Sequence, residues 1–169
     1  IWFGTAQGSL FKRTKVGRYE RVDIETHIKD MIYSIAEDDE GNIWLGTRTG
    51  IVKINKQTNR LSLYTQDKDS IGGNNVFKVL KARDGTLWFA VLGGSLTSYD
   101  GEKFRVWGPE DGMNNQFVLS ATEDSKGNMW FGCYTGGLYK YDGEKFTNYN
   151  EADGLHSNTP YAIIADKDD

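Results

Sequence analysis

The sequence predicts an all-β protein, a β-propeller built of four tandem blades that contain four strands each. Tryptophans recur with separations of 42, 44 and 42 residues, at Trp2, Trp44, Trp88 and Trp130. Each tryptophan lies in a short apolar phrase, and turns rich in glycine and aspartate separate the phrases. No stretch shows a sustained helical period. Repeats of about 40–45 residues with four short strands are typical of propeller blades.

The strands are clearest in the fourth repeat. Asp-Gly pairs and the phrase "EDSKGN" tolerate positive φ angles and therefore suit tight turns between strands. These turns place the four strands of this repeat at 117–122, 129–132, 138–141 and 145–149. Alignment on the tryptophans then predicts the second strands of the last three blades at 43–47, 86–90 and 128–132.

The second strand of each blade is apolar on both sides because a blade buries both faces against its neighbours. We therefore expect Trp44, Trp88 and Trp130 to be buried between blades. A glycine follows two residues after three of the four tryptophans, at Gly4, Gly46 and Gly132. Glycine at these positions permits close approach of a neighbouring backbone.

The period divides the chain into units at 1–30, 31–74, 75–116 and 117–158. Residues 159–169 are then expected to supply the inner strand of the first unit. In this arrangement 161–166 pairs with 1–5, from the same chain or from a neighbouring one, and protects two sheet edges. Three assemblies fit the period: a segment of a larger propeller, a closed ring of four blades, or half of an eight-bladed ring made by two chains.

Composition excludes several classes of protein. The 169 residues suit one domain, and the net charge of −4 comes with dispersed Lys and Arg, so no nucleic-acid partner is predicted. No apolar run approaches the length of about 18 residues needed for a transmembrane helix, so we expect no membrane contact by this segment. The single cysteine, Cys133, excludes a disulfide framework and is expected to be a buried, inert thiol.

The repeat resembles the two-component regulator propeller repeat. The resemblance covers essentially the whole chain and is strongest in the fourth unit, at Gly112-Met113, Val118, Asp124, Gly127, Trp130, Gly132, Gly136-Gly137-Leu138, Tyr141-Asp142, Phe146 and Tyr149. It implies an extracytoplasmic sensor region of a hybrid histidine kinase, hence a periplasmic or extracellular location and a carbohydrate-like ligand. The third unit departs from the pattern, with Ala82 in place of Asp and Ala90-Val91 in place of Gly-Thr.

The sequence carries no motif for catalysis. A nucleophile elbow, a Walker loop and a Cys-His pair are all missing, and His27 and His156 do not occupy equivalent positions in their repeats. We therefore predict a non-enzymatic module with no cofactor and no metal site. Two alternatives stay open: an enzyme resembling streptogramin lyases, whose propellers carry similar Trp-Phe phrases, and a purely structural module for interaction or oligomerisation.

One face of the predicted propeller carries the loops between the second and third strands and those between consecutive blades. Amide side chains in these loops both donate and accept hydrogen bonds, which suits an oligosaccharide or another small molecule with many hydroxyls. The alternative is that these residues serve turn geometry alone. The candidate ligand-binding residues on this face are His27, Asp30, Arg48, Asn74, Asn75, Asn114, Asn115, Gln116, Tyr134, His156 and Asn158.

Overall fold

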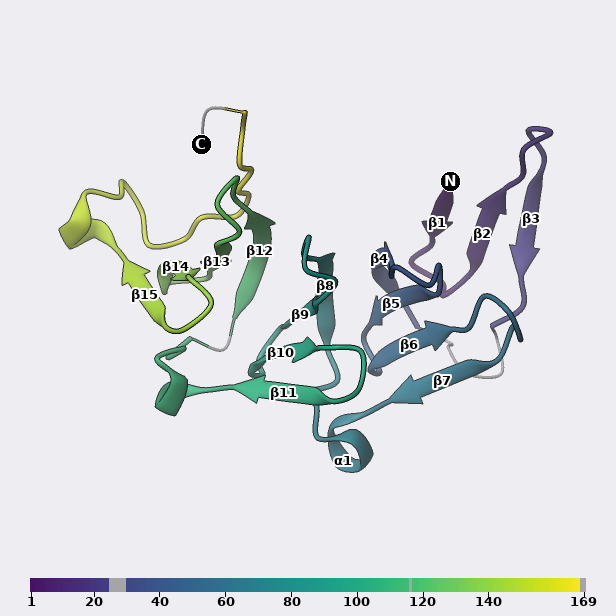
Figure 1. The fold of residues 1–169 in the computed structure, drawn as a ribbon, viewed down its shortest axis with the longest axis horizontal. Coiled ribbons are helices and arrows are strands. Elements are labelled where there is room, and N and C mark those ends of the chain that lie inside the picture. The colour runs from purple at the N-terminus through teal and green to yellow at the C-terminus, as the bar shows by residue number, and fades with distance from the viewer. Residues whose placement is uncertain (25–29, 116, 168–169) are drawn as a thin grey trace.

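The computed structural model describes residues 1–24, 30–115 and 117–167, which form four antiparallel sheets set side by side in an open arc (Figure 1). We call the sheets blades 1 to 4 in chain order. Within each blade the strands follow one another in sequence order, each paired with the next. The all-β propeller fold predicted from the tryptophan period is confirmed.

Blade 1 contains three strands and the other blades contain four each among the described residues. Blade 1 consists of β1 (Trp2–Gly4), β2 (Leu10–Arg13) and β3 (Tyr19–Val22). Blade 2 consists of β4 (Ile32–Glu37), β5 (Ile43–Thr47), β6 (Ile51–Ile54) and β7 (Leu61–Tyr64). Blade 3 consists of β8 (Val76–Lys81), β9 (Leu87–Val91), β10 (Leu96–Tyr99) and β11 (Phe104–Trp107). Blade 4 consists of β12 (Val118–Glu123), β13 (Met129–Cys133), β14 (Gly137–Tyr141) and β15 (Phe146–Tyr149).

Helices in the described residues are single turns in the connections that leave the outer strands. They are α1 (Gln66–Asp69), η1 (Pro109–Asp111) and η2 (Glu151–Asp153). The predicted second strands agree with β5, β9 and β13 to within one residue at each end. The Asp-Gly turns also form as expected: the Asp142 carboxylate accepts hydrogen bonds from the backbone N–H groups of Glu144 and Lys145, both at 3.0 Å.

The hydrophobic core is divided among three seams, each between two neighbouring blades. One cluster joins blades 1 and 2, one joins blades 2 and 3, and one joins blades 3 and 4. Trp44 and Trp88 are buried in the second and third seams, as predicted. Trp130 is only partly buried, which corrects the prediction for that residue, because no complete blade covers its side of blade 4.

Glycine permits the close approach of neighbouring blades, as the sequence predicted. A Cβ added at Gly4 would lie 2.6 Å from Ile32 Cβ, and one added at Gly46 would lie 2.6 Å from the carbonyl oxygen of Val76. At Gly132 the nearest backbone atom would be the carbonyl oxygen of Pro160, at 2.5 Å. Each contact joins a second strand to the start of the next inner segment, so a larger residue would push the blades apart.

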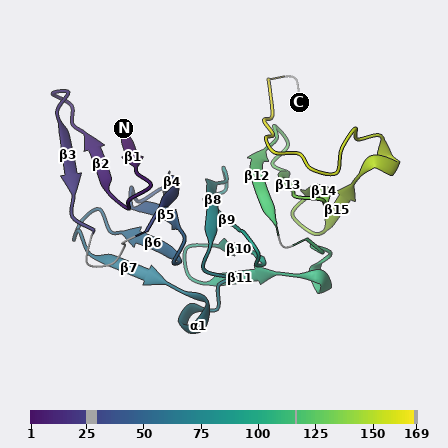
Figure 2. The same ribbon diagram turned by 180° about the vertical axis from the view of Figure 1, so that it is seen from behind.

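The two ends of the described chain lie at opposite ends of the arc (Figures 1 and 2). The expected pairing of 161–166 with 1–5 in the same chain is therefore wrong. β1 pairs with β2 alone among the described strands. The described part of 159–169 instead continues past blade 4: Ser120 Oγ donates to the Pro160 carbonyl at 3.3 Å, and Ala165 N–H donates to Thr122 Oγ1 at 3.4 Å.

Candidate functional site

The loops predicted to carry ligand-binding residues do share one face. Asn115, between blades 3 and 4, donates from Nδ2 to the carbonyl of Tyr134 at 3.1 Å, in the loop between β13 and β14. Asn158 accepts from the Gly137 backbone N–H at 2.8 Å through its carbonyl oxygen. His27 and Gln116 lie outside the described residues.

Several of the candidate polar side chains on this face are occupied by the turns that they cap. The side-chain oxygens of Asn74 and Asn115 accept backbone hydrogen bonds from Gln66 and Phe117, both at 2.8 Å. Those of Asn158 and Asp30 accept from Glu151 and Met31, both at 2.9 Å. These contacts explain the amide-rich composition of the loops by turn geometry.

A smaller set of the candidates remains open to solvent. Arg48, Asn114, Tyr134 and His156 are all exposed. Asn75 differs from them because its Oδ1 atom is buried and has no hydrogen-bond partner among the described residues. The loop face therefore offers a few dispersed polar groups and does not form a converging pocket by itself.

The concave wall of the arc carries a feature that the sequence analysis missed. The pairing of each inner strand with its neighbour shifts register at the second residue of the inner strand. The residues at these irregularities are Tyr33, Phe77 and Leu119, and Tyr161 occupies the same place in the C-terminal segment. β-Bulges of this kind re-aim a side chain. The repeated bulge therefore sets a row of large apolar side chains along the wall.

A groove of about 340 Å³ follows this row across three blades. It is lined by Tyr33, Ser34, Phe77, Lys78, Leu119, Ser120, Ala121, Tyr161, Ala162 and Ile163. The rings of Tyr33 and Phe77 lie 5.4 Å apart, and 36% of Phe77 and 69% of Tyr161 remain exposed. The sequence holds a signal for this row, since Tyr, Phe, Leu and Tyr follow the first residue of each inner segment.

Lys78 is the one charged residue that lines this groove. It is partly buried and forms no ion pair with any of the described residues. The corresponding residues of blades 2 and 4 are serines, which bind backbone groups across the seam; Ser34 Oγ accepts from Val79 N–H at 3.1 Å. Lys78 therefore places an ammonium group among aromatic rings, where an anionic group of a ligand would find a partner.

The acidic turns on the opposite face serve structure. In blade 4 the Asp124 carboxylate accepts from Trp130 Nε1 at 2.8 Å and from Asn128 Nδ2 at 2.7 Å. Burial raises the pKa of Asp124, but the hydrogen bonds from Trp130 and Asn128 outweigh it and lower the pKa to about 2. Asp38 holds Trp44 and Asn42 in the same way in blade 2, with a lowered pKa.

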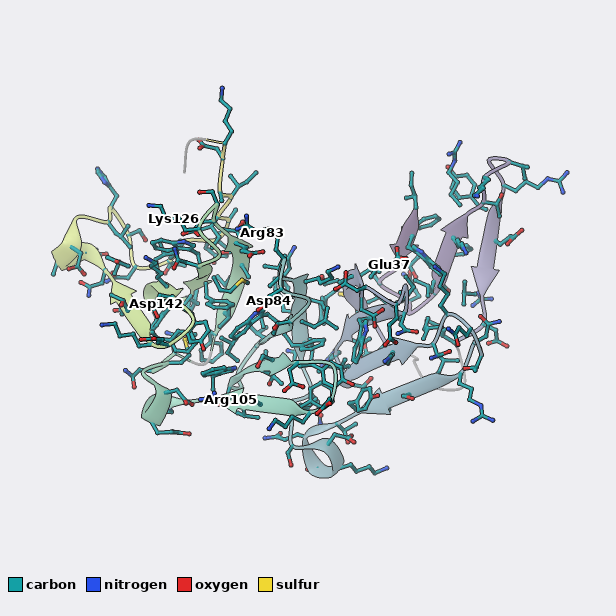
Figure 3. All side chains as sticks on the ribbon, viewed as in Figure 1. Glu37, Arg83, Asp84, Arg105, Lys126 and Asp142 are labelled. Carbon is teal, nitrogen blue, oxygen red and sulfur yellow. The ribbon has the colours of Figure 1, made fainter. Side chains whose placement is uncertain are left out.

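Charged side chains also join neighbouring turns. Arg83 reaches from blade 3 to Glu123 of blade 4, with Nε 3.0 Å from Oε1 (Figure 3). Lys81 forms an ion pair with Asp39 across the preceding seam. No group of three or more His, Cys, Asp or Glu side chains in the described ranges is arranged to hold a metal ion. Cys133 is buried, and burial raises the pKa of its thiol to about 12, so the thiol is inert.

Two segments of the chain, 28–49 and 112–135, match the model of the two-component regulator propeller family. The chain contains two-component regulator propeller repeats. The matched segments each span the inner and second strands of a blade, including the bulge and the tryptophan phrase. No curated relative matches the chain in sequence. None of the helices in the described part is long and apolar enough to cross a membrane.

Several solved structures share the fold of these regulator propeller repeats. The extracellular domain of a putative hybrid two-component system, BT3049 from B. thetaiotaomicron, superimposes with a TM-score of 0.78 at 21% identity over 94% of this chain and 22% of that one. Virginiamycin B lyase from Staphylococcus aureus gives 0.75 at 17% identity, over 98% and 56% of the two chains. PorZ from Porphyromonas gingivalis, a bacterial surface component of the type-IX secretion system, gives 0.71 at 15%, over 98% and 28%.

The first of these comparisons sets the scale of the segment. The chain spans about a fifth of the length of the BT3049 extracellular domain. The identities are low, so these likenesses establish the propeller fold and leave activity open.

Proposed function

We propose that this chain is a non-enzymatic, ligand-binding part of the extracytoplasmic sensor region of a two-component signalling protein, and that its ligand is carbohydrate-like. The repeat family and the extracellular two-component domains among the structural neighbours support the sensor role. The observation that carries the ligand-binding role is the groove on the concave wall, with its row of side chains at bulges.

The chemistry of the groove suits a polyhydroxylated ring. Aromatic faces such as those of Phe77 and Tyr33 pack against the C–H face of a sugar ring, and the Tyr33 hydroxyl offers a hydrogen-bond donor and acceptor. The Lys78 ammonium adds selectivity for a carboxylate or sulfate on that ring. A saccharide with an acidic group therefore fits the wall better than a neutral one.

The position of the groove also links binding to signalling. Its lining residues come from β4, β8 and β12 and from the segment that follows blade 4, so one ligand contacts several blades. A ligand that binds one relative arrangement of the blades more tightly than another shifts the population toward it. In this proposal the angle between blades is the quantity that the ligand fixes.

Calorimetric titration of the chain with neutral and acidic oligosaccharides tests the proposal. We expect Phe77→Ala to weaken binding about tenfold, which corresponds to about 1.4 kcal/mol. Leu63→Ala is the matched control, because Leu63 is 37% exposed and Phe77 is 36% exposed, but Leu63 lies on an outer strand. We expect Lys78→Met to remove the preference for acidic saccharides while neutral saccharides still bind.

Two outcomes would contradict this function. The first is equal binding by the Phe77 and Leu63 variants, which would place the ligand elsewhere. The second is chemical turnover of a bound saccharide or of a cyclic ester, which would favour an enzyme similar to the lyase neighbours.

A further inference from the structure

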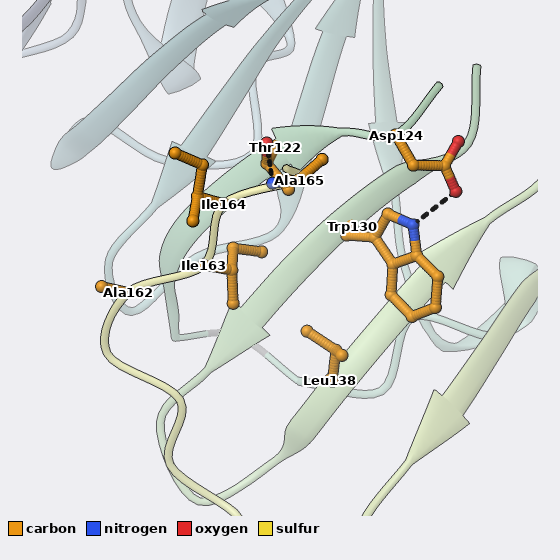
Figure 4. A pocket seen from close by; sticks show the side chains of 8 residues that line it. All are labelled: Thr122, Asp124, Trp130, Leu138, Ala162, Ile163, Ile164 and Ala165. Atoms are coloured by element: carbon orange, nitrogen blue, oxygen red, sulfur yellow. Dashed lines mark hydrogen bonds between the residues drawn. The ribbon is translucent and has the colours of Figure 1, made fainter. Parts of the chain in front are cut away.

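The outer side of blade 4 is an incomplete seam. Trp130, Leu138 and Tyr149 occupy the places that Trp44, Ile51 and Tyr64 occupy in blade 2, as the strand registers show. Trp44 and Ile51 are fully buried by blade 3, whereas Trp130 and Leu138 are only partly buried. A cavity of about 500 Å³ lies beside them, between blade 4 and residues 162–165 (Figure 4). We call Trp130, Leu138 and Tyr149 the blade 4 end face.

The internal seams show what fills this space in a complete seam. Blade 3 covers Trp44 with Phe89, Tyr99 and Phe104, whose rings lie 5.8, 5.0 and 6.5 Å from it. Blade 4 covers Trp88 with Phe131 and Tyr141 at 5.3 and 5.5 Å. A complete seam therefore needs an aromatic residue from the second strand of the next blade and further large side chains from its third and fourth strands.

Blade 1 presents that set of positions to solvent at the other end of the chain. By strand register Phe3 corresponds to Phe89, Arg13 to Tyr99, and Tyr19 to Phe104. Phe3 is stacked on Phe11 at 5.1 Å and meets the edge of Tyr19 at 5.7 Å. Phe3 is 39% exposed and Tyr19 is 65% exposed, although Phe89 is fully buried. We call Phe3, Phe11, Arg13 and Tyr19 the blade 1 end face.

The two end faces also complement each other in charge. In the seam between blades 2 and 3, Tyr99 lies on Trp44, whose indole nitrogen is bound to Asp38. At the blade 4 end face the corresponding tryptophan, Trp130, is bound to the Asp124 carboxylate. The residue that would lie there from blade 1 is Arg13, a guanidinium that stacks on indole and pairs with carboxylate. Lys126, in the same turn, is exposed and can keep its ammonium in solvent.

We propose that the blade 4 end face binds the blade 1 end face of a second copy of this chain. In this contact Trp130 packs on Phe3 and Tyr19 of the second copy, and Arg13 of that copy lies over Trp130 beside Asp124. Residues 161–166 then lie where the inner strand of blade 1 belongs, since blade 1 has only three strands among the described residues. The contact joins different faces, so two copies close into a ring by making it twice.

Light scattering during size-exclusion chromatography tests the contact on the chain itself. We expect a particle of twice the 19.1 kDa chain mass. A monomer at all concentrations would overturn the proposal and leave further blades of a longer chain as the occupant of both faces. Open-ended aggregates that grow with concentration would overturn the closed pair.

Two disrupted variants test the head-to-tail geometry. We expect Phe3→Asp and Leu138→Asp each to be monomeric alone, because each removes one of the two faces. An equimolar mixture of them should regain a dimer, since each variant supplies the face that the other lacks. Dimerisation of either variant alone would show that like faces pair and would overturn the proposal. Leu63→Asp, on the outer strand β7, is the control and should dimerise like the unmodified chain.

A milder substitution keeps the test valid if either aspartate variant fails to fold. Arg13 and Arg60 are both exposed, Arg60 in a turn of blade 2. We expect Arg13→Glu to weaken dimerisation at least tenfold and Arg60→Glu to leave it unchanged. Equal dissociation constants for the two variants would overturn the placement of Arg13 at Asp124.

Discussion

Blades 2 and 3 hold their central tryptophans by different means. In blade 2 the indole nitrogen of Trp44 donates to Asp38 at 2.7 Å, and Asn42 binds the same carboxylate. In blade 3, Ala82 and Thr86 replace these two polar residues, and the indole nitrogen of Trp88 has no partner among the described residues. Trp88 instead stacks on Trp107 at 5.6 Å. A repeat position can therefore be fixed by a charged hydrogen-bond network or by a second large aromatic ring.

Removal of the tryptophans is expected to have the largest effect on this comparison. Trp44→Ala and Trp88→Ala should each lower the free energy of unfolding by about 3–5 kcal/mol, because both leave a large cavity in a seam. Trp130→Ala should cost less, about 1–2 kcal/mol, since part of that side chain is already exposed. Urea denaturation measures all three. A cost below about 1 kcal/mol for Trp88 would mean that Trp107 alone supports blade 3.

The polar network of blade 2 should contribute somewhat less than its tryptophan. Asp38→Ala leaves the buried Trp44 N–H and the Asn42 amide without their acceptor, at a cost of about 2–3 kcal/mol. The counterpart in blade 3 is Ser98→Ala, which removes the acceptor of Trp107 Nε1 at 2.9 Å. We expect about 1 kcal/mol there, because the lost bond joins two neutral groups. Equal costs in urea denaturation would show that the charge of Asp38 adds nothing.

Acid should weaken the blades that have the carboxylate network. The folded-state pKa of Asp124 is about 2, below the value of about 3.9 for an unfolded aspartate. A lowered folded pKa stabilises the fold above the unfolded value, and this stabilisation is lost as the pH falls from about 4 to about 2. Thermal melts over this range should show a smaller decline for Asp124→Asn than for Asp67→Asn, an exposed control on α1. Identical declines would contradict the lowered pKa.

The smallest effect is expected from the lysine that lies over the ring in blade 2. Lys53 Nζ is 4.9 Å from the Trp44 ring centroid, whereas the corresponding residue of blade 3 is Ser98. Lys53→Gln should lower the free energy of unfolding by about 0.5–1 kcal/mol through the lost cation–π contact. Differential scanning calorimetry at low and high salt checks this. No change at either salt concentration would remove Lys53 from the comparison.

The sequence predicted the strands of the blades closely because tryptophans and turns mark each one. It also predicted the glycines that let blades approach, since the reason for Gly46 lies within one seam. The predicted same-chain closure was wrong because the angle between blades is not periodic information. That angle depends on packing within each seam, and Ala90 stands in blade 3 where Gly46 stands in blade 2.

The concave groove was missed for a different reason. Tyr33, Phe77 and Leu119 look like ordinary strand residues, and only a register shift between paired strands turns them to the wall. The loop amides posed the opposite problem. Asn74 and Asn115 look available for a ligand in the sequence, but their oxygens bind neighbouring backbone. Both features depend on local backbone geometry that composition does not encode.

The division of the core into three separate seams has a consequence for how the molecule loses its structure. Each cluster contains residues from two adjacent blades, and none extends across a third. Stability in such a row behaves as a sum of nearest-neighbour couplings. The terminal blades have one coupling each and the middle blades have two. Amide exchange should therefore be fastest in β1–β3 and β12–β15, and it should slow toward the coupling between blades 2 and 3.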